Sequence, residues 1–236
     1  MPSDSFDFPA GEVLLIDKPL GWTSFDVVKK VRNAIRIKKV GHAGTLDPLA
    51  TGMLILCTGR ATKTIDSIQG QTKEYIATIK FGATTASYDA ELPEENLHDV
   101  SSLTRDNIEA AIEQFRGMVT QVPPIYSAVK VDGKRAYEQA RKGKEVKLRE
   151  RTVQVYAFEL MEQVEASHTW KARIECSKGT YIRSLAHDLG QALGVGAYLT
   201  GLIRTRIGDY QLENAWKIDD LIDAIHKQRA GEVREN

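Results

Sequence analysis

The residues best suited to chemistry lie in one glycine-rich run, Gly41–Gly52, with the sequence GHAGTLDPLATG. Its three glycines permit positive φ angles and a close approach of the backbone to a ligand. Asp47 is the only acidic residue in this otherwise neutral run. A lone carboxylate on such a loop is a candidate nucleophile or general base. The alternative is an aspartate that caps a helix or shapes the Asp47–Pro48 turn.

Two further residues stand where a site needs them. Tyr75 opens a segment with alternating apolar and polar residues, and Arg183 falls in the first turn of a helical pattern after Gly179. A cation in the first turn of a helix opposes the helix dipole by roughly 0.3–1 kcal/mol. We therefore expect a carboxylate partner for Arg183, and Asp47 is a candidate that would stay ionised in such a pair. The alternatives to these roles are that Tyr75 is an ordinary core residue and that Arg183 lies at the surface.

Several common catalytic motifs are absent from the sequence. The Gly41–Thr45 segment lacks the lysine and the spacing of a phosphate-binding P-loop, and Gly194-x-Gly196 lacks the third glycine of a dinucleotide fingerprint. Neither HExxH nor GxSxG occurs, and the five histidines are scattered. The sequence therefore predicts no protein-bound metal, and a reaction carried by a carboxylate, a few polar groups and the substrate.

Composition indicates a soluble globular chain of 236 residues, with 42% hydrophobic and 27% charged residues. No stretch approaches the roughly 18 apolar residues of a membrane span. The short acidic N-terminus has neither the basic nor the apolar region of a signal peptide. Cys57 and Cys176 stand apart from any CxxC pair and are predicted to be buried thiols of a cytoplasmic protein.

Charge is unevenly distributed although the net charge is zero. Lys29–Lys39 has six basic residues and no acidic one, and Lys130–Arg151 has nine basic residues against four acidic ones. Thr85–Phe115 has eight acidic residues and one basic residue. Local basic patches attract phosphate backbones whatever the net charge. Solvated helix faces are the alternative explanation for each run.

Hydrophobic periodicity predicts interleaved strands and helices, and hence one α/β domain. The predicted strands are Glu12–Ile16, Met53–Cys57, Glu74–Phe81, Thr152–Val164 and Thr169–Cys176. The predicted helices are Phe25–Ile37 with an N-cap at Thr23 or Ser24, one marked by Ile108–Phe115, one after Gly179, and a C-terminal amphipathic segment around Leu221–Ile225. The segment 122–147 is predicted to be a long basic surface excursion.

Four segments together resemble the TruB-type tRNA pseudouridine synthases. They are Asp17–Ser24, Gly41–Gly52, Pro123–Lys130 and Gly179–Leu185, in the order of that family, and the resemblance covers about residues 12–210. It implies isomerisation of uridine to pseudouridine at position 55 in the T-loop of transfer RNA, without cofactor or metal. The implied partner is the T-arm of transfer RNA, and we expect a monomer without membrane attachment.

The resemblance also implies an α/β fold with a mixed, mostly antiparallel central sheet flanked by helices and loops. We expect a single catalytic domain over residues 1–236 with a core of about 10–210. The basic segment of about 122–147 resembles the thumb-like insertion of the family. The residues 209–236 are expected to form a short acidic helical tail, too short for the RNA-binding PUA domain that many members carry.

The resemblance assigns roles to individual residues. Asp47 aligns with the catalytic aspartate, which would attack C6 of the base or C1′ of the ribose, or otherwise assist glycosidic cleavage. Tyr75 would stack on the flipped uracil and could act as a base, and Arg183 would pair with Asp47. His42 would help hold the everted nucleotides. Tyr181 and Leu202 would line the uracil pocket, with core packing as their alternative.

Phosphate contacts are expected from basic residues spread along the chain: Lys18, Lys63, Lys130, Lys134, Arg135, Arg141 and Lys142. Contacts of this kind position RNA without selecting a base. Three other functions are alternatives to this one. A guide-RNA-dependent synthase of the dyskerin branch is disfavoured by the short chain, and a nucleotide-binding or hydrolytic enzyme by the absent motifs. A non-catalytic RNA chaperone would use the same basic surfaces without Asp47.

Overall fold

The computed structural model describes residues 5–127, 129–131, 133–140, 142, 146, 148–164 and 168–234. Contacts between residues divide the chain into two compact units. The first unit comprises residues 1–73 and 203–236, and the second comprises residues 74–202. The single catalytic domain expected from the sequence stays a prediction.

The first unit combines short strands with helices. Its elements are β1 (Val13–Lys18), α1 (Ser24–Ile35), β2 (Val40–His42), β3 (Ala50–Thr58), the 3-10 helix η1 (Gly59–Thr64), α2 (Ile65–Gly70), β13 (Tyr210–Gln211), the 3-10 helix η3 (Leu212–Asn214), β14 (Trp216–Lys217) and α6 (Ile218–Arg234). Strand β12 (Ala197–Ile207) begins in the second unit and ends in the first. The strand order is β14-β1-β3-β12, with β2 beside β3 and β13 beside β12.

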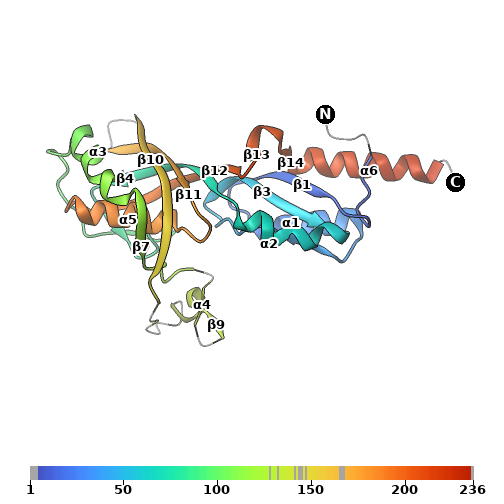
Figure 1. Cartoon of the computed structure of the whole chain (residues 1–236), viewed down its shortest axis with the longest axis horizontal. Helices are drawn as coiled ribbons and strands as arrows, with labels where there is room; N and C mark the ends of the chain where they lie inside the picture. Colours follow the sequence, from blue (N-terminus) through green and yellow to red (C-terminus); the bar gives the residue numbers. More distant parts are fainter. Residues whose placement is uncertain are drawn as a thin grey trace. The chain divides into compact units, whose positions relative to one another are not determined.

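Strand β3 is buried on both faces, as its unbroken apolar sequence predicts. Leu54 and Leu56 face a cluster that includes residues of α1 and α6, whereas Met53, Ile55 and Cys57 face a second cluster. Figure 1 shows the two helices α1 and α6 and the strands β1 and β3 of this unit. The strand that follows the glycine-rich run is therefore the centre of the first unit.

Helix α1 begins where the sequence predicts and ends earlier. Thr23 is its N-cap and forms a capping box with Asp26, so the predicted N-cap is confirmed at Thr23. Arg36 adopts a left-handed conformation with φ 58°, and its N–H donates to the carbonyl of Arg32. This cap ends the helix at Ile35, two residues before the predicted boundary, because apolar spacing alone does not reveal the left-handed residue.

The second unit contains most of the longer strands. Its elements are β4 (Lys73–Phe81), β5 (Thr84–Thr85), β6 (Glu94–Glu95), α3 (Arg105–Ile112), the 3-10 helix η2 (Glu113–Phe115), β7 (Gly117–Gln121), β8 (Lys130–Val131), β9 (Lys134–Arg135), α4 (Ala136–Ala140), β10 (Arg151–Val164), β11 (Thr169–Cys176) and α5 (Ile182–Ala192). The strand order is β12-β4-β11-β10-β7. Strand β10 is antiparallel to both of its neighbours.

The sequence patterns of the second unit are confirmed. Strand β4 alternates between buried and half-buried residues, with Tyr75 on the buried side, as its period of two predicts. The predicted strand pair β10 and β11 is antiparallel. Helix α5 starts at Ile182, shortly after Gly179 with its φ of 81°. Together with the first unit, this confirms the expected mixed fold with a mostly antiparallel sheet and flanking helices.

The described residues of the basic excursion 122–147 include regular secondary structure. They contain the antiparallel pair β8 and β9 and the short helix α4, which project from the rest of the second unit in Figure 1. Gly133, with φ 77°, lies between the two strands. Hydrophobic periodicity did not predict this hairpin, because a strand of two residues is too short to show a period. In the described part of the chain, no helix has the length and apolar character needed to cross a membrane.

Gly52 offers a test of this strand packing. It has φ 93°, and an added Cβ atom would lie 2.4 Å from the backbone oxygen of Arg204. We expect Gly52→Ala to lower the free energy of unfolding by roughly 2–4 kcal/mol, because backbone strain and overlap add. Gly70→Ala is the control, since no atom lies within 4 Å of its added Cβ. Equal urea midpoints for the two variants would contradict the tight packing.

Candidate active site

The loop between β2 and β3 carries Asp47, and its backbone is fixed on both sides of that residue. The carbonyl of Asp47 accepts a hydrogen bond from the N–H of Ala50 at 3.0 Å, which closes a turn. Just before it, the hydroxyl of Ser24 accepts from the N–H of Leu46 at 2.9 Å and donates to its carbonyl at 3.2 Å. Just after it, the carbonyl of Pro48 accepts from the N–H of Gly21. The start of α1 therefore holds the half-buried Asp47 in place.

A buried arginine supports the same loop from β12. Arg204 is only 1% exposed, and its Nε donates to the carbonyl of Met53 at 2.7 Å. Its two terminal nitrogens point to the carbonyls of Thr45 and Gly44 at 3.4 and 3.3 Å. The rigid guanidinium fork can serve several carbonyls at once. The sequence contains no sign that Arg204 belongs to the site, since nothing in a strand pattern distinguishes a buried arginine from an exposed one.

Lys18 is the second buried cation of the loop. Its residue is 0% exposed, and its ammonium donates to the carbonyls of Pro19 at 2.9 Å and Trp22 at 2.6 Å. Lys18 pairs with Gly52 in the register of β1 and β3. This interior position does not fit the phosphate contact expected from the sequence, because a phosphate contact requires an accessible ammonium. A lysine is exposed by default, and its residue type alone cannot signal this burial.

Burial of Lys18 lowers the pKa of its ammonium to about 8, and the nearby charge of Arg204 acts in the same direction. The carboxylate of Asp47 opposes this and raises the pKa of Lys18. The influence of Asp47 is the largest among the acids that act on Lys18. The two groups thus interact electrostatically, and the partner of the carboxylate on the loop is a desolvated positive charge.

His42 lies in β2 at the entrance to the loop. Its Nδ1 atom is buried and has no hydrogen-bond partner among the described residues. Burial is the main cause that lowers the pKa of His42, and the charge of Arg204 lowers it further. We therefore expect a neutral imidazole at pH 7, which offers either a donor or an acceptor to a ligand.

Arg183 occupies the first turn of α5 in the second unit and is 5% exposed. Its guanidinium forms an ion pair with Asp89 at 3.3 Å and donates to the carbonyls of Ser87 at 3.1 Å and Tyr126 at 2.9 Å. The hydroxyl of Ser87 also donates to the carboxylate of Asp89 at 2.6 Å. A buried carboxylate partner therefore exists for Arg183, while its predicted pairing with Asp47 stays a prediction.

Asp89 was missed in the sequence because it belongs to the acidic stretch 85–115, where it resembles the exposed carboxylates around it. It is buried, and it also accepts a hydrogen bond from the N–H of Glu91 at 3.0 Å.

The remaining predicted residues of the second unit occupy strands and a helix cap. Tyr75 is buried in β4, and Leu202 is half-buried in β12. Tyr181 is the N-cap residue of α5, and the side-chain amide of Gln121 exchanges two hydrogen bonds with its backbone N–H and carbonyl. The guanidinium of Arg151 lies 5.1 Å from the centre of the Tyr181 ring. That Tyr75, Tyr181 and Leu202 lie close to Asp47 stays a prediction.

The predicted phosphate contacts fall in different parts of the chain. Lys63 is exposed in η1 of the first unit. Lys130 and Arg135 are paired residues of β8 and β9 in the thumb-like segment. Arg141 lies outside the described residues. Within the described part of the chain, no group of three or more His, Cys, Asp or Glu residues is placed to hold a metal ion.

The coupling between Lys18 and Asp47 can be measured directly. Asp47→Asn removes the carboxylate that raises the pKa of Lys18, so we expect this pKa to fall below about 8. Asp17→Asn is the matched control and should have a smaller effect, because Asp17 is the weakest of the contributing acids. NMR titration of the lysine side chains reports both changes. A Lys18 pKa that is insensitive to Asp47→Asn would refute the electrostatic contact.

Comparison with known proteins places this loop in a family. Residues 32–182 match the model of the TruB family pseudouridylate synthase N-terminal domain, and residues 183–235 match that of the tRNA pseudouridylate synthase B C-terminal domain. A Phocaeicola vulgatus protein named tRNA pseudouridine synthase B is 51% identical over 96% of this chain and 98% of its own length. A Bacteroides thetaiotaomicron protein of the same name is 50% identical over 98% of this chain and 99% of its own length.

Solved structures agree with these sequence matches. One chain of a crystal structure of a Cbf5-Nop10-Gar1 complex superposes with a TM-score of 0.70 and 33% identity, over 92% of this chain and 54% of that chain. An archaeal box H/ACA sRNP Nop10-Cbf5 complex contains a chain with a TM-score of 0.70 and 28% identity, over 99% of this chain and 61% of that chain. The matched models and the full-length relatives together show that this chain belongs to the TruB family of pseudouridylate synthases.

Proposed function

We propose that this protein isomerises uridine to pseudouridine at position 55 in the T-loop of transfer RNA. The observation that carries the proposal is the Gly41–Gly52 loop, where Ser24 holds the backbone of Leu46 next to Asp47, and where the Asp47 carboxylate acts on the buried ammonium of Lys18. Two relatives that are 51% and 50% identical over nearly the whole chain are named tRNA pseudouridine synthase B. We propose a cytoplasmic monomer that needs no metal or cofactor.

Asp47 is the proposed nucleophile. A carboxylate that attacks C6 of the uracil or C1′ of the ribose must be ionised and must point consistently at the nucleotide. The buried ammonium of Lys18 supplies a positive charge that interacts with this carboxylate, and the turn to Ala50 fixes the backbone from which the side chain projects. A carboxylate that instead stabilises a departing uracil by assisting glycosidic cleavage would have the same requirements.

Tyr75, Tyr181 and Leu202 are proposed to receive the flipped base. Extracting a nucleotide from a folded loop costs a few kcal/mol, which stacking on an aromatic ring offsets in part. Tyr181 is suited to this because Gln121 fixes its backbone. We propose that Arg183, oriented by Asp89, sets the charge around the reacting nucleotide, and that the neutral imidazole of His42 holds an everted base.

The thumb-like segment is proposed to close on the T-arm. Lys130, Arg135 and Arg141 in this segment and the exposed Lys63 would contact phosphates, which position RNA without reading its sequence. The projection of β9 and α4 from the second unit suits a segment that folds over a large ligand.

Asp47→Asn tests the central assignment. We expect tritium release from C5-labelled uridine in transfer RNA to fall by at least a thousandfold, because the amide cannot act as a nucleophile. Binding of the RNA should persist, since the backbone turn at Asp47 does not depend on its carboxylate. Asp66→Asn, an exposed aspartate of α2, is the control and should keep full activity. Substantial turnover by Asp47→Asn would exclude the nucleophilic role.

Tyr75→Phe separates stacking from proton transfer. The variant keeps the ring, so we expect RNA affinity to change little while turnover falls by roughly a hundredfold, the size of a general-base contribution. Tyr156→Phe changes an exposed tyrosine of β10 and serves as the comparison. Carbodiimide treatment followed by primer extension locates the product on the transfer RNA. Full activity of Tyr75→Phe would limit Tyr75 to stacking, and a product outside the T-loop would contradict the proposed position.

A further inference from the structure

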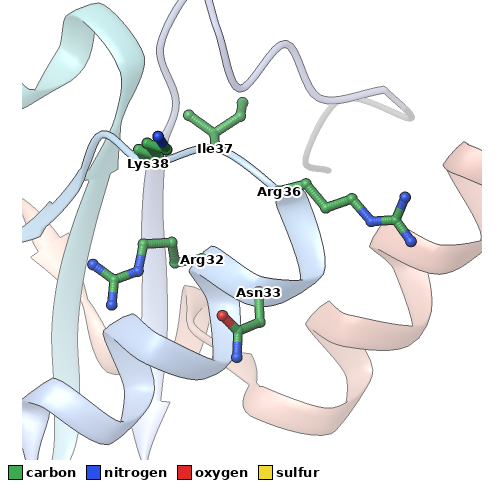
Figure 2. Close-up of a pocket in the computed structure, with 5 residues that line it drawn as sticks. All are labelled: Arg32, Asn33, Arg36, Ile37 and Lys38. Atoms are coloured by element: carbon green, nitrogen blue, oxygen red, sulfur yellow. The ribbon is translucent and has the colours of Figure 1, made fainter.

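A basic pocket lies on the first unit at the C-terminal end of α1. It is a shallow depression open to solvent, with a volume of about 390 Å³, and is lined by Arg32, Asn33, Arg36, Ile37 and Lys38. Figure 2 shows these side chains arranged around the bend where α1 ends and the chain continues towards β2. Three of the five lining residues carry a positive charge.

Among the residues that the structure describes, the fold does not use the side chains of Arg36 and Lys38 for its own hydrogen bonds or ion pairs. The last carbonyls of α1 already have partners, since the Arg36 N–H donates to Arg32 and the Arg229 guanidinium of α6 donates to Ala34 at 2.9 Å. The side chains of Arg36 and Lys38 are exposed, and no hydrogen bond or ion pair joins either of them to another described residue. Cations near a helix C-terminus gain only about 0.3–1 kcal/mol from the dipole. The side chains of Arg36 and Lys38 are therefore available to an external anion.

An exposed aromatic ring adjoins the pocket. Phe25 is 61% exposed, and the guanidinium of Arg32 lies 6.0 Å from the centre of its ring. An aromatic face that remains in water beside unpaired cations is the arrangement on which unpaired bases stack while cations hold their phosphates. An acidic protein surface would use the cations but has no need of the ring. RNA therefore fits this surface better than an acidic polypeptide.

The pocket is joined to the catalytic loop by a short piece of chain. Lys38 and His42 are four positions apart in the chain, which spans at most about 14 Å. The segment is held by hydrogen bonds from the N–H of Val40 to the carbonyl of Lys38 at 3.1 Å and from the N–H of Gly59 to that of Lys39 at 3.0 Å. Pocket and loop therefore keep a fixed relation within the first unit.

We propose that this pocket binds backbone phosphates of the RNA substrate that flank the nucleotide at Asp47, and that Phe25 stacks on an unpaired base there. The inference rests on the proposed function and adds a second RNA-binding surface to the thumb-like segment. Arg36 and Lys38 supply the phosphate contacts, and Arg32 joins them to the ring.

The test compares two double variants with the same loss of charge. Arg36→Gln with Lys38→Gln removes the exposed cations of the pocket, and Lys29→Gln with Lys30→Gln removes two exposed cations of α1 outside it. Binding of an unmodified transfer RNA transcript is measured between 50 and 200 mM salt. We expect the pocket variant to reduce the slope of log K against log salt by about 1–2, and the comparison variant to reduce it by clearly less. Phe25→Leu should weaken binding several-fold without changing the slope.

Several outcomes would overturn the inference. Equal slope changes in the two double variants would show a diffuse positive field without a pocket. An unchanged RNA affinity of the pocket variant, with lost binding of polyglutamate, would assign the surface to an acidic polypeptide. Pseudouridine formation by the wild-type protein is measured in parallel. A wild-type protein that binds the transcript without forming pseudouridine contradicts the proposed function, and the slope comparison still decides the pocket.

Discussion

The burial of Arg204 beneath the glycine-rich loop is the interaction on which the first unit depends. Its guanidinium reaches the carbonyls of Met53, Thr45 and Gly44, and its own backbone lies so close to Gly52 that only glycine fits there. A buried charge of this kind is costly unless its donors are matched by acceptors. The carbonyls of Met53, Thr45 and Gly44 are these acceptors, so Arg204 holds the backbone on both sides of Asp47.

Each unit contains a buried cation whose charge is compensated by hydrogen bonds and a carboxylate. In the first, Lys18 is desolvated by its strand and donates to two carbonyls, while the carboxylate of Asp47 raises its pKa. In the second, Arg183 is oriented by Asp89 and two carbonyls. Fixed charges in a water-poor setting need no reorganisation as a reaction proceeds, so they stabilise developing charge more strongly than mobile surface groups.

The sequence predicted the elements whose periodicity is long and regular. The alternation of β4 placed Tyr75 on the buried side, and Thr23 marked the start of α1. It failed where the deciding feature is short or depends on distant residues. The left-handed Arg36 ended α1 early, the hairpin of β8 and β9 was too short for a pattern, and Asp89 resembled its exposed acidic neighbours. Lys18 was expected to contact a phosphate, whereas its neighbours in the fold bury it.

Residue types at fixed spacing along the chain were enough to identify the family and the glycine-rich loop with Asp47 as its only acid. Only the tertiary structure decided which cations lie buried beside that loop and which remain exposed. Lys18 and Arg204 come from strands β1 and β12 on either side of β3, whereas Arg36 and Lys38 follow the end of a helix. The burial of a lysine or an arginine is set by what packs around it, and residues far away in the chain provide that packing.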